Sequence, residues 1–333
     1  MLESLPKQVK VVEVGPRDGL QNESKIVPTA DKVQLIEALA QTGLSHIEIT
    51  SFVSPKWIPQ LADGPEVAAR LSLPQGVHTS ALVPNMQGYE AAKKAGLPEI
   101  AVFMSATESH SKKNINKSIG EALAVVKPLT DTAKQDGKRV RAYLSVVFAC
   151  PYEGVVKPSQ VLPLLRDLVA LGVDELSLGD TIGAANPKQV LDLLSAMKGE
   201  FDFDKVALHF HDTRGIALVN VVAGLSSGIT IFDASLGGMG GCPYAPGASG
   251  NLATEDLVYL LDSLGVKTGV NLDKLVECGR LAERLLNKTL PGRYLRSRLA
   301  DGAGDQQDEI SHKHPGDSKA TLADSIRSRF TKQ

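Results

Sequence analysis

The chain has 333 residues, with 36 Lys and Arg against 38 Asp and Glu, so its formal net charge is −2. This balance argues against a dedicated nucleic-acid-binding protein, which normally carries a basic stripe. A composition of 43% hydrophobic and 22% charged residues is typical of a globular protein and excludes global disorder.

Short β-branched runs alternate with longer helical patterns along most of the chain, at a spacing of roughly 30 residues, the length of one βα unit. In chain order, the predicted strands are 9–14, 46–52, 78–83, 99–105, 140–147, 175–178, 205–210 and 231–235. Several are nearly continuous apolar runs, as expected when both faces of a parallel sheet are covered. Eight such units predict an α/β protein with a (β/α)8 TIM barrel rather than an open doubly wound sheet.

Start signals mark several of the helices between these strands. They are Pro28-Thr29 before 30–41, Pro187 before 188–198, and Asp212-Thr213 before 215–225. Pro128 lies inside the fourth helical pattern, where we expect it to kink or divide the helix. Two further helices are predicted after the eighth strand, at 255–264 and 272–286.

The composition changes after about residue 296, where Asp, Gly, Gln and His become frequent. We therefore expect two regions. Residues 1–296 form a TIM-barrel catalytic domain with C-terminal helical additions, and residues 297–333 form a polar, flexible tail.

Reactive side chains collect where the predicted strands end, which is where TIM barrels place their active sites. His209 and His211 are two apart on a strand and so point to one face, as a pair of metal ligands would. Two hydrogen-bonded structural histidines are the alternative. Asp18, after the first strand, is the best third ligand, and a mixed nitrogen and oxygen site suits Mg²⁺ or Mn²⁺, with Zn²⁺ as an alternative.

Other charged residues share this edge of the predicted barrel. Arg17 offers a fixed cation for an enolate or carboxylate oxygen, although Arg17 and Asp18 could also form a simple loop ion pair. Glu48 lies between β-branched residues, so it should point inward as a base, an orienting group or a partner of Arg17. Asp180 is either catalytic or a cap for the next helix.

A glycine-rich loop follows the eighth strand and contains Cys242, which should be accessible there. Asn251, where the loop ends, could offer a carbonyl oxygen to a metal or cap the next helix. The chain has only three cysteines, an odd number without a Cys-x-x-Cys motif, which favours a reducing cytoplasm over a disulfide framework.

The polar segment 105–116 contains Lys112 and Lys113, which could meet the phosphates of a cofactor-linked substrate. A solvated loop is the alternative for this segment. No apolar run reaches the roughly 20 residues needed to span a bilayer, so we expect no membrane partner.

Long motifs resemble the 3-hydroxy-3-methylglutaryl-CoA lyase family over about residues 8 to 290. They are Val12-Glu-Val-Gly-Pro-Arg-Asp-Gly-Leu-Gln-Asn-Glu23, Thr50-Ser-Phe-Val-Ser-Pro-Lys-Trp57, Cys150-Pro-Tyr-Glu-Gly154, Ser177-Leu-Gly-Asp-Thr181, His209-Phe-His-Asp-Thr213 and residues 240–256. The Arg-Asp pair and the His-x-His pair are shared with isopropylmalate and homocitrate synthases, whereas the cysteine loop distinguishes the lyases.

The resemblance implies roles for individual residues. Asp18, His209, His211 and Asn251 would bind Mg²⁺ or Mn²⁺, Arg17 would stabilise an enolate oxygen, Cys242 would protonate the acetyl-CoA carbanion, and Glu48, Asp180 and Glu255 would be active-site carboxylates. Substrate contacts are expected from Arg17, Gln21, Asn22, Lys112, Lys113 and Thr181. Animal members have Lys after the Gly-Leu-Gln-Asn-Glu run, whereas this chain has Ser24, so a role for the next lysine is not carried over.

The implied reaction is retro-Claisen cleavage of 3-hydroxy-3-methylglutaryl-CoA to acetyl-CoA and acetoacetate, in leucine degradation or ketone-body metabolism. The alternatives are a lyase for the longer 3-hydroxy-3-isohexenylglutaryl-CoA, a condensing acyltransferase of the synthase type, a metal-dependent amidohydrolase and a non-catalytic barrel. Because neither an organelle presequence nor a peroxisomal tripeptide is evident, we expect a bacterial-type, cytoplasmic enzyme. The resemblance further implies a homodimer that acts on an acyl-CoA substrate.

Overall fold

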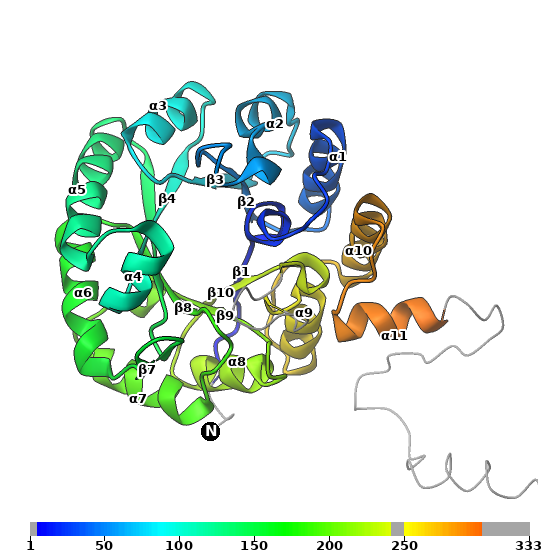
Figure 1. The fold of residues 1–333 in the computed structure, drawn as a ribbon. Helices are drawn as coiled ribbons and strands as arrows, with labels where there is room; N and C mark the ends of the chain where they lie inside the picture. Colours follow the sequence, from blue (N-terminus) through cyan, green and yellow to red (C-terminus); the bar gives the residue numbers. More distant parts are fainter. Residues whose placement is uncertain (1–4, 241–249, 302–333) are drawn as a thin grey trace, which may run out of the picture. The chain divides into compact units, whose positions relative to one another are not determined.

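The computed structural model describes residues 5–240 and 250–301 of the chain. Its eight parallel strands close into a barrel in the order β1-β10-β9-β8-β5-β4-β3-β2, and β1 pairs with both β10 and β2. Helices surround the barrel (Figure 1). The predicted (β/α)8 TIM barrel is therefore confirmed.

The eight predicted strands correspond to the eight barrel strands. These are β1 (Lys10–Glu13), β2 (His46–Ser51), β3 (His78–Leu82), β4 (Glu99–Ser105), β5 (Arg139–Ser145), β8 (Glu175–Asp180), β9 (Val206–Phe210) and β10 (Ile231–Ala234). A short hairpin of β6 (Ala149–Cys150) and β7 (Gly154–Val155) was not predicted, since strands of two residues carry no periodic signal.

The helices of the barrel lie mostly between consecutive strands. They are α1 (Thr29–Ala40), α2 (Gly64–Arg70), α3 (Met86–Lys94), α4 (Glu108–Ile115), α5 (Ile119–Gln135), α6 (Pro158–Ala170), α7 (Pro187–Met197) and α8 (Ala217–Ser226). After β10 come α9 (Thr254–Ser263), α10 (Leu272–Leu286) and α11 (Arg293–Asp301). Asp212 accepts a hydrogen bond from the N–H of Ala217, as its predicted position before α8 requires.

Two local expectations were wrong in part. Helix α5 is not divided at Pro128, because its buried face, including Val126 and Leu129, packs on the barrel and outweighs the loss of one helical hydrogen bond. The segment 105–116 contains helix α4 instead of being a loop throughout. Its sequence has no apolar stripe, so the helical period was not visible in it.

Charged side chains fill part of the barrel interior. Arg141 is fully buried and pairs with Glu175 and with Asp233, while Glu175 also pairs with Lys10. Because an unpaired buried charge is costly, these pairs fix the positions of their strands relative to one another. Asp233 also contacts His209, so the network reaches the end of β9.

One compact unit comprises Met1–Arg298. The boundary predicted at residue 296 falls inside α11, and the predicted tail lies outside the described residues from residue 302 onward. Among the described residues, no helix combines the length and hydrophobicity needed to cross a membrane.

Candidate metal site

Arg17 and Asp18 lie in a π-helical turn, Gly15–Gly19, directly after β1. The carbonyl of Val14 accepts hydrogen bonds from the N–H groups of Arg17, Asp18 and Gly19, at 3.1, 2.7 and 3.3 Å. π-Helical turns are rare and often occur at functional sites. The turn projects the Asp18 carboxylate toward the end of β9.

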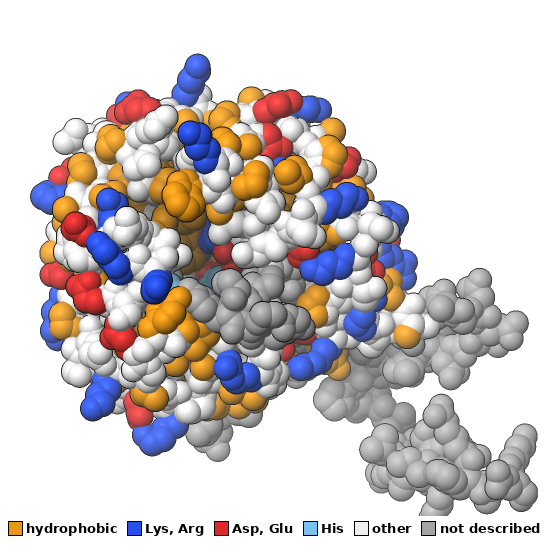
Figure 2. Space-filling view, in the orientation of Figure 1, with side chains coloured by type: hydrophobic (Ala, Val, Ile, Leu, Met, Phe, Trp, Pro, Cys, Tyr) orange, Lys and Arg blue, Asp and Glu red, His pale blue; other side chains and the backbone are white. Residues whose placement is uncertain are grey.

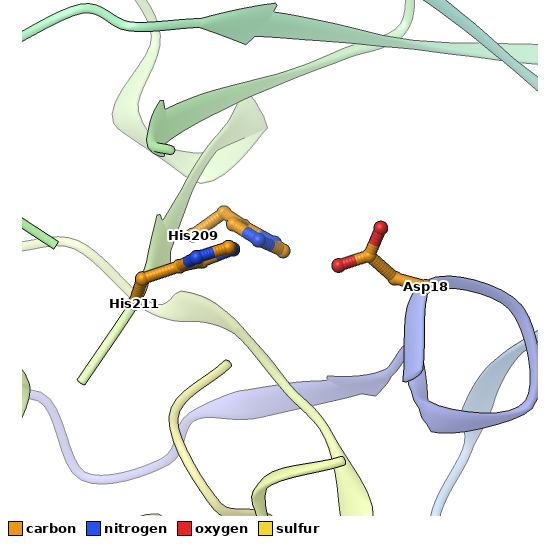
Figure 3. A group of neighbouring side chains, drawn as sticks. All are labelled: Asp18, His209 and His211. Atoms are coloured by element: carbon orange, nitrogen blue, oxygen red, sulfur yellow. The ribbon is translucent and has the colours of Figure 1, made fainter. Parts of the chain in front are cut away.

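His209 and His211 extend from the end of β9 toward Asp18 (Figure 3). One ligand atom from each of these three residues lies within 4.8 Å of the other two. The strand period predicted the pair of histidines, and closure of the barrel between β9, β10 and β1 brings Asp18 to it. The three side chains can therefore hold one metal ion.

Asn251 is the fourth predicted ligand, and a backbone bridge places it beside His211. Its Nδ2 donates to Asp18 Oδ2 at 2.8 Å and to the carbonyl of Met239 at 3.1 Å. Its Oδ1 is buried and has no hydrogen-bond partner among the described residues. A buried acceptor of this kind needs a partner, and a cation would supply one, so the donor set fits a divalent metal.

The protonation states of the site also suit a cation. Burial would raise the pKa of Asp18, but the charges of Arg17, His209 and His211 together with the hydrogen bond from Asn251 lower it to about 2. Burial and the neighbouring His209 lower the pKa of His211 to about 3. At neutral pH the site thus offers an ionised carboxylate and a neutral imidazole, the forms that bind metals.

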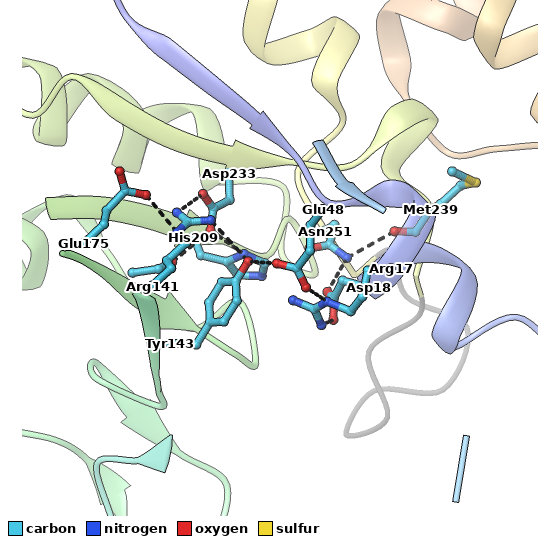
Figure 4. A network of polar contacts seen from close by, with 11 residues as sticks. Arg17, Asp18, Glu48, Arg141, Tyr143, Glu175, His209, Asp233, Met239 and Asn251 are labelled. Carbon is cyan, nitrogen blue, oxygen red and sulfur yellow. Dashed lines mark hydrogen bonds and ion pairs between the residues drawn. The ribbon is translucent and has the colours of Figure 1, made fainter. Parts of the chain in front are cut away.

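Arg17 is held between two carboxylates. Its Nε donates to Glu48 on β2 and its Nη1 donates to Asp18 (Figure 4). The hydroxyl of Tyr143 on β5 donates a hydrogen bond to the other oxygen of Glu48. The Arg17 guanidinium carbon lies 5.2 Å from the centre of the Tyr143 ring. The predicted pairing of Glu48 with Arg17 is confirmed.

Tyr143 and Asp233 belong to the site but were not predicted. Asp233 on β10 accepts from His209 Nδ1 at 3.3 Å through Oδ2, from Ser177 at 2.8 Å and from Arg141 at 2.6 Å. A carboxylate on one imidazole nitrogen leaves the other nitrogen to face the metal. The sequence signal that could have identified Asp233 is an acidic residue within the apolar predicted strand 231–235. The same kind of signal identified Glu48.

A cavity of about 780 Å³ opens at these residues, and Figure 2 shows hydrophobic side chains on the wall of the hollow. Five of the predicted substrate-binding residues line it: Arg17, Gln21, Asn22, Lys113 and Thr181. Lys112 does not. Apolar residues of β3, β4, α4 and α5 form much of the remaining wall, so the cavity suits a ligand with polar and apolar parts.

Three predicted carboxylates do not line this cavity: Glu48, which pairs with Arg17, and also Asp180 and Glu255. Asp180 accepts from the N–H groups of Ala184 and Ala185 and thus caps the turn that follows β8, and burial raises its pKa to about 6. Glu255 is buried on α9, where it accepts from the N–H of Gly237 at 2.7 Å, and burial raises its pKa to about 8. The predicted acid Cys242 lies outside the described residues.

Comparison with known proteins gives a consistent result. The HMGL-like family model matches residues 8–282. Hydroxymethylglutaryl-CoA lyase YngG of Bacillus subtilis is 53% identical over 291 residues, which are 87% of this chain and 97% of that protein. The 3-hydroxy-3-isohexenylglutaryl-CoA/hydroxy-methylglutaryl-CoA lyase of Pseudomonas aeruginosa is 47% identical over 297 residues, 89% of this chain and 99% of that protein.

A solved structure is similar as well. The HMG-CoA lyase from Acinetobacter baumannii, in complex with coenzyme A and 3-methylmalate, superposes with a TM-score of 0.83 at 36% identity. The match covers 93% of this chain and 98% of that chain.

Proposed function

The chain belongs to the HMGL-like family and cleaves 3-hydroxy-3-methylglutaryl-CoA, and we propose that Asp18, His209, His211 and Asn251 hold the divalent cation, Mg²⁺ or Mn²⁺, for this reaction. The observation that carries the proposal is the convergence of three ligand atoms within 4.8 Å at the cavity. The unpartnered Oδ1 of Asn251 supports it as the fourth ligand.

The reaction breaks the C2–C3 bond of the substrate. A base takes the proton of the C3 hydroxyl, the C3 oxygen forms the new carbonyl of acetoacetate, and the bond electrons leave as the enolate of acetyl-CoA. When bound, the cation would lower the pKa of that hydroxyl and fix its orientation. Asp18 is ionised and lines the cavity, so we propose that it removes the hydroxyl proton, alone or with a neighbouring group.

We propose that Arg17 stabilises the negative charge that develops on the thioester oxygen. Its side chain is buried and locked by Glu48 and Asp18, so it needs little reorganisation as charge appears. The proton that converts the enolate to acetyl-CoA would come from Cys242, an assignment that rests on the family resemblance.

The direct experiment measures acetyl-CoA and acetoacetate from 3-hydroxy-3-methylglutaryl-CoA before and after removal of metal with EDTA. Activity should disappear on chelation and return with Mg²⁺ or Mn²⁺. Full activity after thorough chelation would refute the metal site.

The longer thioester 3-hydroxy-3-isohexenylglutaryl-CoA is a second candidate substrate, because the relative from Pseudomonas aeruginosa carries both substrates in its name. The apolar walls of the cavity favour testing it. Comparing kcat/KM for the two thioesters decides between them. Incubation with acetyl-CoA and 2-oxo acids, with an assay for free CoA, tests the condensing alternative.

We further propose that the protein is a cytoplasmic homodimer that acts in leucine degradation. These assignments follow from the resemblance to bacterial-type lyases. Light scattering after size-exclusion chromatography measures the oligomeric state, and growth of a deletion strain on leucine tests the pathway.

A further inference from the structure

Glu13, the last residue of β1, is completely buried and lies outside the set of residues assigned to the reaction. Its Oε1 accepts hydrogen bonds from the N–H of Gly15 at 2.7 Å and from the N–H of Leu236 at 2.8 Å. Its Oε2 accepts from the hydroxyl of Thr254 at 2.6 Å. One carboxylate therefore joins three separate segments of the chain.

Each of these segments is part of the metal site or supports it. Gly15 begins the turn that carries Asp18, and Thr254 begins α9 three residues after Asn251. Leu236 begins the turn that leads to Met239, whose carbonyl accepts from Asn251. Glu13 thus connects the backbones that present two metal ligands, Asp18 and Asn251, and the group that orients one of them.

The segments are also packed closely against one another. A Cβ at Gly15 would lie 2.5 Å from Glu13 Oε1 and 3.0 Å from the Cε of Met239. A Cβ at Gly19 would lie 2.9 Å from the Cβ of Met239. The turn of Asp18 therefore rests directly on the segment around Met239, and small displacements of either would separate the ligands.

We propose that Glu13 is a positioning residue that holds Asp18 and Asn251 at the separation at which they share a cation. The proposal rests on the metal site described under the proposed function. A residue that acted only on stability would change the melting temperature of the metal-free protein and leave the Mn²⁺ affinity of the folded protein unchanged.

The test measures Mn²⁺ binding to the full-length protein by electron paramagnetic resonance, together with thermal unfolding. Glu13→Leu removes all three hydrogen bonds, and we expect at least a tenfold loss of Mn²⁺ affinity, as is usual when support of metal ligands is lost. Glu13→Gln keeps one acceptor for Gly15 and Leu236 and places an amide donor beside the Thr254 oxygen, so its affinity should stay within about threefold of wild type.

A matched control separates positioning from stability. Leu165 is fully buried on α6, and Leu165→Ala should lower the melting temperature without changing Mn²⁺ affinity. Equal loss of Mn²⁺ affinity in Leu165→Ala and Glu13→Leu would overturn the proposal, as would wild-type affinity in Glu13→Leu.

If Glu13→Leu does not fold, Thr254→Val decides, because it removes only the hydrogen bond to Glu13 Oε2. Unchanged Mn²⁺ affinity in Thr254→Val overturns the proposal, and weaker affinity supports it. A wild-type protein that does not bind Mn²⁺ would instead refute the metal site itself.

Discussion

The amide nitrogen of Asn251 lies 2.8 Å from Asp18 Oδ2, although the two residues are 233 positions apart in the chain. This contact uses the only donor group of the Asn251 side chain and leaves Oδ1 as an unpartnered acceptor among the described residues. In the proposed site, the carboxylate of Asp18 and the amide oxygen of Asn251 would be hard oxygen ligands, whereas the two histidines would supply nitrogen. The proposed site therefore combines oxygen and nitrogen ligands.

We predict that Asn251→Ala weakens Mn²⁺ binding at least tenfold, because it removes both the amide oxygen and the bond that orients Asp18. Isothermal titration calorimetry with Mn²⁺ measures this effect. Asn114→Ala is a suitable control, since Asn114 lines the cavity but is not among the proposed ligands. Equal affinity of Asn251→Ala and wild type would remove Asn251 from the ligand set.

Asp233→Asn should also reduce metal affinity, although Asp233 does not face the metal. Its Oδ2 accepts from His209 Nδ1 and thereby favours the imidazole form whose Nε2 is free to bind a metal. An amide at this position can donate to Nδ1 and stabilise the opposite tautomer. We expect a 10- to 100-fold weaker Mn²⁺ affinity, which is the usual effect of removing a carboxylate that hydrogen-bonds to a metal-binding histidine.

Ser177→Ala provides the comparison for this effect. Ser177 donates to the same oxygen of Asp233 at 2.8 Å but does not contact the histidine. Its removal should change Mn²⁺ affinity only slightly. If both substitutions weaken binding to the same degree, the carboxylate acts through packing and not through the tautomer of His209.

The barrel could be predicted from sequence because each strand carries its own local signal. The eight apolar runs and the spacing between them were sufficient, and His209 and His211 followed from the two-residue period of a strand. Asp18 could be added because TIM barrels place strand ends on one face. Each of these inferences uses a short stretch of chain and one general rule of the fold.

The missed residue Tyr143, and the side-chain direction of the predicted residue Glu255, depend on contacts between distant parts of the chain. Tyr143 lies in an apolar run and looks like an ordinary core residue until β5 is placed opposite β2, where it meets Glu48. Glu255 follows a predicted ligand by four positions, yet its side chain turns to the backbone of Gly237. Sequence places such residues on an element, but the direction of their side chains depends on the packing of the whole barrel.

Arg17→Lys should lower kcat strongly while leaving Mn²⁺ affinity within a few-fold of wild type. A lysine cannot donate to Glu48 and Asp18 in the fixed planar geometry that the guanidinium uses here. Loss of one oxyanion donor typically reduces kcat by about 10²- to 10³-fold. Steady-state kinetics alongside Mn²⁺ titration measure both quantities, and a kcat near the wild-type value would contradict the assigned role of Arg17.

For Cys242→Ser we predict loss of most of the turnover with metal binding retained. A serine hydroxyl is a far weaker acid than a thiol, so protonation of the enolate should become slow. Cys278→Ser is the control, because Cys278 is buried on α10 and does not line the cavity. Unchanged turnover in Cys242→Ser would exclude the cysteine as the acid.

The stability of the protein should fall as the pH rises through the range in which Glu255 titrates. Burial raises the pKa of Glu255 from its ordinary value of 4.5 to about 8, and the nearby charges of Glu13 and Asp256 add to this effect. Between these two pH values the folded protein keeps a proton that the unfolded chain has released, so the free energy of unfolding decreases as the pH increases. Well above pH 8, the decrease in the free energy of unfolding that Glu255 causes is complete.

Glu255→Gln removes this titration and keeps the acceptor for Gly237. The melting temperature of Glu255→Gln minus that of wild type should therefore be several degrees larger at pH 8.5 than at pH 5. Each pKa unit corresponds to about 1.4 kcal/mol of unfolding free energy. Thermal unfolding at the two pH values checks this, with Glu90→Gln on the exposed surface of α3 as the control. The same difference from wild type at both pH values would show that Glu255 does not hold a proton in the folded protein at neutral pH.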